Sequence, residues 1–150
     1  MNVDIRGPWS ETDIQQFLTQ VRFPVRLACV AGDGFPRVVS LWYQYVEGLL
    51  LCVTHKDSHL ASLLRNNARV GFEVSPNDPS YHGLRGQGRV ELELVGSSNT
   101  LVELLNRYLG GTQSSLGKWL LSRTDEELLI TVRPHRLFNW DYRERMADVL

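Results

Sequence analysis

The feature that most constrains the fold is a series of short apolar runs joined mostly by short connections. VRLACVA, LLLCVT and RVGFEV each have the length and apolar content of a single strand. No regular alternation of strand and helix occurs, as a parallel sheet would require. We expect six or seven strands and three or four helices. The sequence therefore predicts a mainly β (α+β) protein built as an antiparallel barrel with flanking helices.

The sequence also predicts where the main elements begin and end. Ser10 predicts the start of a helix over residues 10–21, because its hydroxyl can cap the first free amides. A second helix is predicted over residues 60–67, with Asn66-Asn67 ending it in the left-handed conformation. The other predicted elements are a long strand over 36–46, a strand with a glycine bulge over 84–95, helices over 98–109 and 114–123, and final strands over 127–134 and 136–142.

The predicted strand over residues 36–46, PRVVSLWYQYV, is apolar or aromatic on both faces. Side chains alternate along a strand, so Tyr43 and Tyr45 lie on one face and Val38 and Trp42 on the other. A strand with one face in water does not have this composition. We expect a second layer over the face of Val38 and Trp42, formed by a partner subunit, a flat ligand or the flanking helices.

Length, charge and cysteine content exclude several function classes. The chain is long enough for one domain, 1–150, and its formal charge of -1 provides no field for nucleic acid. No run is long and apolar enough to span a membrane, and the first residues lack the pattern of a secretory signal. We therefore expect a cytoplasmic protein with neither a nucleic-acid nor a membrane partner. Cys29 and Cys52 lie in apolar runs and are expected to be buried thiols.

Polar side chains gather where the strand LLLCVT leads into the second predicted helix. The cluster consists of Thr54, Lys56, Asp57, Ser58 and His59. Hydroxyls and free amides at a helix start are suited to a phosphate, and Lys56 and His59 can add positive charge. The alternative is that Asp57 or Ser58 simply caps its own helix, and the Asp57 carboxylate would compete with an anion. The junction therefore predicts either a phosphate site or a capped helix.

No other pattern identifies a catalytic centre. His55 and His59 lack the glutamate pattern of a zinc-binding helix, so we predict no metal site. A nucleophile elbow and a Cys/His pair are also lacking, and the glycines at 86–88 are too few for a dinucleotide fingerprint. We assign no catalytic side chain.

Four motifs, in this order, resemble the flavin-binding split-barrel proteins, the group similar to pyridoxamine-phosphate oxidase. They are GFPRVVSLWY, THKDSHL followed by LLRNNARVGFEV, YHGLRGQGRVEL and VRPHRLFNWD. The resemblance extends from about Pro24 to Asp141. It implies a six-stranded antiparallel split β-barrel with flanking helices, which forms a homodimer and holds FMN in a groove between the two subunits.

The resemblance also implies a set of cofactor-binding residues. These are Ser40, Leu41, Trp42, Thr54, Lys56, Ser58, His59, Arg85, Gln87 and Trp140. The hydroxyls of Thr54 and Ser58 match contacts to the flavin phosphate, and residues 40–42 match positions beside the isoalloxazine ring. Two polar residues of the strand over 84–95 match contacts to the ring or the ribityl chain, and Trp140 matches an aromatic from the other subunit.

The chain departs from this family at two places. Many members have Arg-Lys where this chain has His59-Leu60, and proline where it has Ser40. Each lost cation weakens phosphate binding by roughly 1.5 to 3 kcal/mol, and Lys56 offsets part of this loss. The implied function is a flavin-dependent oxidoreductase acting on a small-molecule substrate. The alternatives are a non-enzymatic module that binds flavin, the deazaflavin cofactor F420 or haem, and a barrel without a permanent cofactor.

Overall fold

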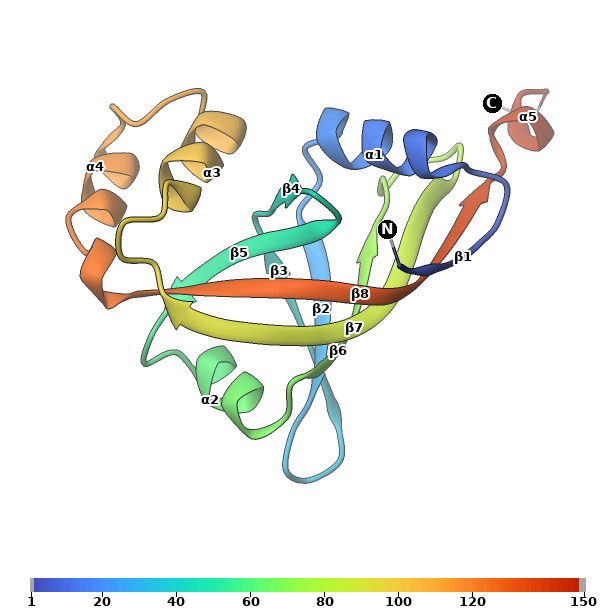
Figure 1. Ribbon diagram of the computed structural model, residues 1–150. Coiled ribbons are helices and arrows are strands. Elements are labelled where there is room, and N and C mark those ends of the chain that lie inside the picture. Colours follow the sequence, from blue (N-terminus) through green and yellow to red (C-terminus); the bar gives the residue numbers. More distant parts are fainter. Residues whose placement is uncertain (1, 149–150) are drawn as a thin grey trace.

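The apolar runs of the sequence pair into one curved sheet, shown in Figure 1. The computed structural model describes residues 2–148, so the predicted domain 1–150 extends beyond this range at both ends. Seven strands follow the order β3-β2-β6-β7-β8-β5-β4 with antiparallel neighbours, and β1 pairs with β8 in parallel. The strands are β1 Asp4–Arg6, β2 Val25–Val30, β3 Pro36–Leu41, β4 Gln44–Val46, β5 Leu49–His55, β6 Arg69–Val74, β7 His82–Leu94 and β8 Glu127–Asp141.

Helices lie around this sheet, as predicted for an antiparallel barrel with flanking helices. They are α1 Glu11–Gln20, α2 His59–Asn66, α3 Thr100–Leu109, α4 Ser115–Leu121, α5 Arg143–Met146 and a 3-10 turn over Thr124–Glu126. In Figure 1, α1 and α2 lie on opposite sides of the sheet, and α3 and α4 form a separate pair next to β5. Among residues 2–148, no helix has both the length and the apolar character needed to cross a bilayer.

The core fills the inside of the curved sheet. Alternate residues of the strands point inward, such as Leu27 on β2, Phe72 on β6 and Cys52 on β5. The apolar face of α1 covers the barrel with Ile14, whose exposed fraction is 0%, and two neighbours on the same face. Burial of this kind stabilises by roughly 1.5 to 3 kcal/mol for each large apolar side chain, so the inward stripe of each strand fixes its register.

The predicted long strand over residues 36–46 is interrupted, and this prediction was wrong. Trp42 and Tyr43 separate β3 from β4, which are the two end strands of the sheet. The Tyr43 amide donates to the Tyr108 hydroxyl of α3 at 3.3 Å instead of joining a ladder. The Trp42 ring stacks on the Tyr108 ring, with 5.2 Å between centroids and 6° between planes. The antiparallel path has seven strands, within the predicted six or seven and one more than the resemblance implied, and two residues connect its end strands.

The sequence predicts a β-bulge from the glycines of β7, and the long β7-β8 ladder confirms it. The register shifts between Gln87 and Gly88, so that β8 carries one extra residue, His135. A Cβ on Gly88 would collide with the Arg133 carbonyl oxygen, so only glycine fits there. Pro134 is tolerated opposite Gly88 because a bulge relaxes the ladder. The two strands predicted over 127–134 and 136–142 are therefore one continuous strand.

The β7-β8 ladder also encloses a long excursion of the chain. Leu94 pairs with Leu128, and the Val95 amide donates to the Glu127 carbonyl at 2.9 Å. The segment between them, with α3 and α4, therefore leaves and rejoins the sheet at the same place.

Helix starts follow the prediction better than helix ends. Ser10 caps α1 in a reciprocal capping box with Asp13. The predicted left-handed stop at Asn66-Asn67 is wrong, because Asn67 has extended angles, φ -147° and ψ 111°. Its side chain instead accepts a hydrogen bond from the Arg69 amide at 3.0 Å. The chain passes directly from α2 into β6 and needs no left-handed turn.

Candidate functional site

The predicted ring-contact residues Ser40, Leu41 and Trp42 lie where β3 ends and the chain bends. Together they form one wall of a hollow of about 220 Å³ between the barrel and the α3-α4 pair. Its other lining residues are Val53, Leu101, Leu104, Leu120 and Glu127. The hollow is mostly apolar, and it is smaller than the roughly 300–1,000 Å³ of a typical ligand pocket.

The helix α3 covers Trp42. This answers, for one end of the strand, what forms the second layer over the face of Val38 and Trp42. One ring face of Trp42 is occupied by Tyr108, so a flanking helix forms the second layer at this position. Val38 lies on the same strand face and remains 67% exposed. The helices therefore cover only one end of that face.

A buried ion pair borders the same hollow. The Arg123 Nε atom donates to the Glu127 carboxylate at 2.6 Å, and the Arg123 guanidinium lies 4.3 Å from the centre of the Trp119 ring. The Glu127 side chain is only 4% exposed. Sequence reasoning missed this pair. The four-residue spacing from Arg123 to Glu127 could have indicated an ion pair. The burial of the Glu127 side chain depends on tertiary packing and could not be predicted from this spacing.

At the β5-α2 junction, the structure shows a capped helix. The Ser58 hydroxyl accepts a hydrogen bond from the Ala61 amide at 3.0 Å, so Ser58 is the N-cap of α2. The Thr54 hydroxyl donates to Ser58 at 2.9 Å. Two hydroxyls that the sequence predicted to work together are therefore in direct contact. Capping and phosphate binding remain compatible, because a cap uses one amide of the first turn and leaves others free.

His55 ties this junction to the chain that precedes β8. Its Nδ1 atom accepts a hydrogen bond from the Asp57 amide at 3.0 Å, and its Nε2 atom lies 3.2 Å from a Glu126 carboxylate oxygen. The amide donor assigns the proton to Nε2, which donates to Glu126. The Lys56 amide also donates to the Glu126 carbonyl at 2.9 Å. His55 therefore connects the turn at residues 55–58 to the segment that precedes β8.

The same contacts leave a corner that could accept an anion. Within residues 2–148, the amides of His59 and Leu60 have no hydrogen-bond partner. Lys56, which precedes them in the chain, is half-buried, and the His59 side chain is exposed. The corner has unpaired amide donors and a hydroxyl, with a lysine two residues before the cap, which suits a phosphate group. Asp57 is exposed and provides the opposing charge that the sequence indicated.

The remaining predicted contacts, Arg85, Gln87 and Trp140, lie on the outer face of the sheet. The Arg85 guanidinium packs 4.9 Å from the Phe138 ring centre and 5.7 Å from the Trp140 ring centre. The Gln87 side-chain amide lies 3.0 Å from the His135 ring. Arg85, Phe138 and Trp140 line a shallow hollow of about 210 Å³ that is distinct from the one at Trp42.

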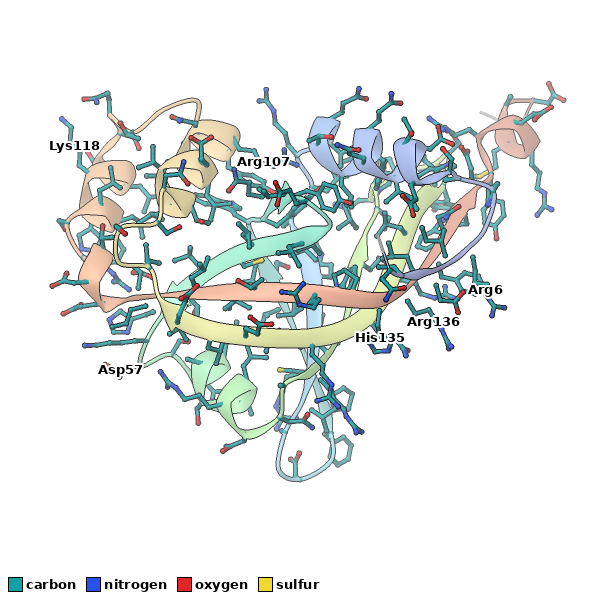
Figure 2. All side chains as sticks on the ribbon, in the orientation of Figure 1. Arg6, Asp57, Arg107, Lys118, His135 and Arg136 are labelled. Carbon is teal, nitrogen blue, oxygen red and sulfur yellow. The ribbon has the colours of Figure 1, made fainter. Side chains whose placement is uncertain are left out.

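One chain does not bring the predicted residues into a single pocket. Ser40 and Arg85 share a row across the sheet, Ser40–Arg26–Glu73–Arg85. Three strand spacings separate them, or about 14 Å. In Figure 2, Asp57 of the β5-α2 junction lies away from His135 and Arg136 of β8. Within one chain, the residues of the β3 end and those of the outer face therefore line separate hollows.

The two thiols and the possible metal-ligating side chains of the described chain give no further candidate site. Burial raises the pKa of the Cys52 thiol to about 12, and burial also raises the pKa of Cys29. Both thiols are therefore protonated at neutral pH and poor nucleophiles. Within residues 2–148, no three His, Cys, Asp or Glu side chains lie close enough to hold a metal ion.

Comparison with known proteins gives matches among solved structures. No protein-family model matches the chain, and the search of curated proteins found no match. The conserved hypothetical protein Rv2991 of Mycobacterium tuberculosis superposes with a TM-score of 0.78 at 24% identity, covering 92% of this chain and 88% of that one. An F420 reductase superposes at 0.69 with 22% identity, covering 81% and 94%. The chain has the split-barrel fold of the pyridoxamine 5'-phosphate oxidase-like proteins.

This split-barrel fold also includes proteins whose names indicate other roles. The heme storage protein HutZ of Vibrio cholerae superposes with a TM-score of 0.66 at 17% identity, and the match covers 85% of this chain and 92% of HutZ. The fold predicted from the four sequence motifs is thus confirmed. The cofactor and the activity have to be argued from the residues of this chain.

Proposed function

We propose that this split-barrel protein binds FMN between two copies of the chain and acts as a flavin-dependent oxidoreductase. The observation that carries the proposal is the corner at the β5-α2 junction. There a hydroxyl and unpaired amides lie at the start of a helix, with Lys56 two residues before the cap, in a fold that an F420 reductase shares. This donor set fits the phosphate end of the cofactor.

In this proposal, polar groups of one chain bind the phosphate end of the cofactor, and residues at the end of β3 lie beside its ring. Ser58 and the amides of His59 and Leu60 bind the phosphate, with Lys56 as counter-charge. Ser40 and Leu41 lie beside the ring, and the apolar hollow behind Trp42 keeps water away from it. The bound flavin supplies the electron-transfer chemistry, so the protein needs to position it and tune its surroundings.

The second copy completes the site. Arg85, Gln87 and Trp140 are about 14 Å or more from the ring-contact strand within one chain, so we assign them to the partner's side of the groove. The aromatic surface of Phe138 and Trp140 is suited to cover a flat ring. A homodimer is thus part of the proposal, and a small-molecule substrate would enter the same groove.

Replacing Ser58 by Asp tests the phosphate corner without removing the helix cap. Asp caps as well as Ser, so α2 should keep its stability, but its charge repels a phosphate. We expect Ser58→Asp to weaken FMN binding at least tenfold and to leave riboflavin, which has no phosphate, within about twofold. Flavin fluorescence titration measures both affinities.

Ser114→Asp is the matched control. Ser114 caps α4 in the same way, accepting from the Gly117 amide at 3.0 Å. This variant should leave both flavins unaffected. Equal FMN affinity in the wild type and Ser58→Asp would contradict the proposed phosphate site.

A non-enzymatic binding module is the second candidate function. It is favoured by the composition of the junction, because Lys56 is the one lysine or arginine between Thr54 and Leu60, and stronger phosphate binding would use more. Absorbance titrations with haem and with F420, beside FMN, distinguish the cofactors. If neither NADH nor NADPH reduces the bound FMN, and an added electron acceptor is not turned over, the result would favour the binding module over the oxidoreductase.

A further inference from the structure

One buried carboxylate lines the hollow of about 220 Å³ behind Trp42, which we call the Trp42 hollow. It belongs to Glu127, whose side chain is 4% exposed. The strand β8 needs only the main chain of this residue, because its carbonyl accepts from the Val95 amide and its backbone pairs with His55. The geometry of the ladder therefore does not explain why the side chain is charged.

The ion pair with Arg123 does not explain the charge either. The Arg123 Nε atom donates to Glu127 Oε1 at 2.6 Å. A buried ion pair is often no more stabilising than apolar residues of the same volume, since both charges lose their water. Leu101 and Leu104, which line the same hollow, are buried and would be suitable neighbours for an apolar side chain. A carboxylate at this place therefore indicates a role for the carboxylate itself.

One oxygen of this carboxylate has no partner. Within residues 2–148, no side chain or amide donates a hydrogen bond to Glu127 Oε2. It is also not one of the unpartnered atoms that the described chain encloses completely, so it keeps access to open space. Because Glu127 lines the Trp42 hollow and is otherwise covered, we infer that this oxygen faces the hollow.

The charges around the hollow restrict which group this oxygen can bind. Arg123 offsets the charge of Glu127 but does not itself line the hollow. An anionic group would meet the carboxylate oxygen without a cation, and a cationic group would lie near the Arg123 guanidinium in mostly apolar surroundings. A neutral O–H or N–H group avoids both costs and supplies the missing donor.

The size of the hollow restricts the ligand as well. Apolar side chains of three elements form its walls, with Val53 from β5, Leu104 from α3 and Leu120 from α4. A cavity of about 150 Å³ with walls of this kind holds one benzene molecule. At about 220 Å³, the Trp42 hollow has room for one ring with a small substituent and is too small for the three-ring system of a flavin.

We propose that the Trp42 hollow is a substrate subsite for a neutral, single-ring molecule whose O–H or N–H group donates to Glu127. The role as a substrate rests on the proposed function, in which Ser40 and Leu41 lie beside the flavin ring and also line this hollow. A ring held here lies next to the flavin and excludes water from it. Binding itself needs neither FMN nor a second copy, because one chain supplies all these lining residues.

Phenol is a suitable probe, because it combines one apolar ring with one neutral donor. We expect it to bind the FMN-free wild-type protein with a dissociation constant on the order of 1 mM, measured by calorimetric titration. Anisole has the same ring but no donor, so it should bind at least tenfold more weakly. Benzoate places a carboxylate against Glu127 and should also bind at least tenfold more weakly than phenol.

Two leucine variants test the hollow without changing either member of the ion pair. Leu120→Phe fills the hollow and should weaken phenol binding at least tenfold. Leu116→Phe makes the same change at a 46% exposed position of the same helix, and its affinity should stay within about twofold of wild type. The melting temperature of each variant shows whether it is folded.

Glu127→Gln tests the carboxylate. It replaces a charged acceptor by a neutral one, so the preference for phenol over anisole should fall to about threefold or less. If this variant does not fold, the leucine variants and the comparison of phenol with anisole still decide the proposal.

Four results would overturn the proposal. They are no phenol binding to the wild type, equal binding of phenol to Leu120→Phe and wild type, anisole binding as tight as phenol binding, and displacement of phenol by one equivalent of FMN. Ser58→Asp should retain phenol binding. Phenol binding to a protein that does not bind FMN would remove the flavin proposal and leave the Glu127 binding site, so the two failures are distinguishable.

Discussion

Asp141, the last residue of β8, shows how single polar side chains hold the ends of this chain together. Its carboxylate accepts hydrogen bonds from Arg143 Nε at 2.9 Å and from the indole Nε1 of Trp9 at 3.1 Å. These donors, Arg143 above all, hold the pKa of Asp141 well below its usual range. The ionised carboxylate thus connects the segment before α1 to the end of the sheet.

This interaction predicts an acid-dependent loss of stability. A folded pKa below the unfolded value of about 3.9 means that Asp141 stabilises the fold above that pH, and the contribution is lost as pH falls toward the folded pKa. Asp141→Asn should therefore be less stable than wild type at pH 7, and the difference should shrink below about pH 4. Urea unfolding at pH 7, 5 and 3 measures this. A difference independent of pH would contradict the role of the charge.

Some residue roles follow from local pattern, and others do not. The capping roles of Ser10 and Ser58 could be predicted because a cap involves only its own helix. Glu127 and Tyr108 could not be assigned, since their partners come from other elements. The sequence indicated the hydroxyls at the β5-α2 junction but not that Thr54 and Ser58 bond to each other.

At the scale of elements, α3 contacts both the end of α1, through Arg107, and the bend between β3 and β4, through Tyr108. The Arg107 guanidinium donates to the Thr19 carbonyl at 2.9 Å and to the Leu18 carbonyl at 3.0 Å, and it also contacts the Val21 carbonyl. These are the free carbonyls at the end of α1, which a cation stabilises. Figure 2 shows Arg107 between α3 and α1.

Removing this cation should loosen α1 from the barrel. Arg107→Met keeps most of the side-chain stem but removes the donor to the Thr19 and Val21 carbonyls, while the Tyr43 hydroxyl still donates to the Leu18 carbonyl at 2.8 Å. We expect a loss of roughly 1.5 to 3 kcal/mol in the free energy of unfolding. Arg65→Met on the exposed face of α2 should stay within about 0.5 kcal/mol of wild type. Equal losses in the two variants, measured by denaturant unfolding, would show that Arg107 has no special role.

The elements could be predicted where their own spacing defines them. The inward stripes of β2, β5 and β6 and the apolar faces of α1 and α3 follow from residues a few positions apart. The break between β3 and β4 could not be predicted, because the Tyr108 hydroxyl that takes the Tyr43 amide is 65 residues away. The short strand β1 is defined only by its pairing with β8.

At the scale of the whole molecule, apolar side chains remain exposed on the β2-β3 hairpin. Phe35 is 69% exposed and Val38 is 67% exposed. Val38 lies in the same cross-strand row as Ala28, on the outer face of the sheet. An apolar patch at this place is suited to the second copy that the proposed cofactor site requires.

We predict that the wild-type protein has twice the 17.1 kDa mass of the chain in solution. Val38→Asp should produce a monomer, because it places a charge in the apolar contact. Leu94→Asp, at a 56% exposed position at the far end of β7, is the control and should remain dimeric. Light scattering after size-exclusion chromatography measures the mass. A monomeric wild type would remove the proposed interface.

The excursion between β7 and β8 makes this barrel modular. Because Leu94 and Leu128 are paired neighbours, the intervening helical segment can be exchanged for another of different length or sequence without moving a strand. A graft would have to supply equivalents of Arg107 and Tyr108, which support α1 and the chain bend. Beyond those two contacts, new helices at this point could change what fits next to Trp42 while the scaffold stays the same.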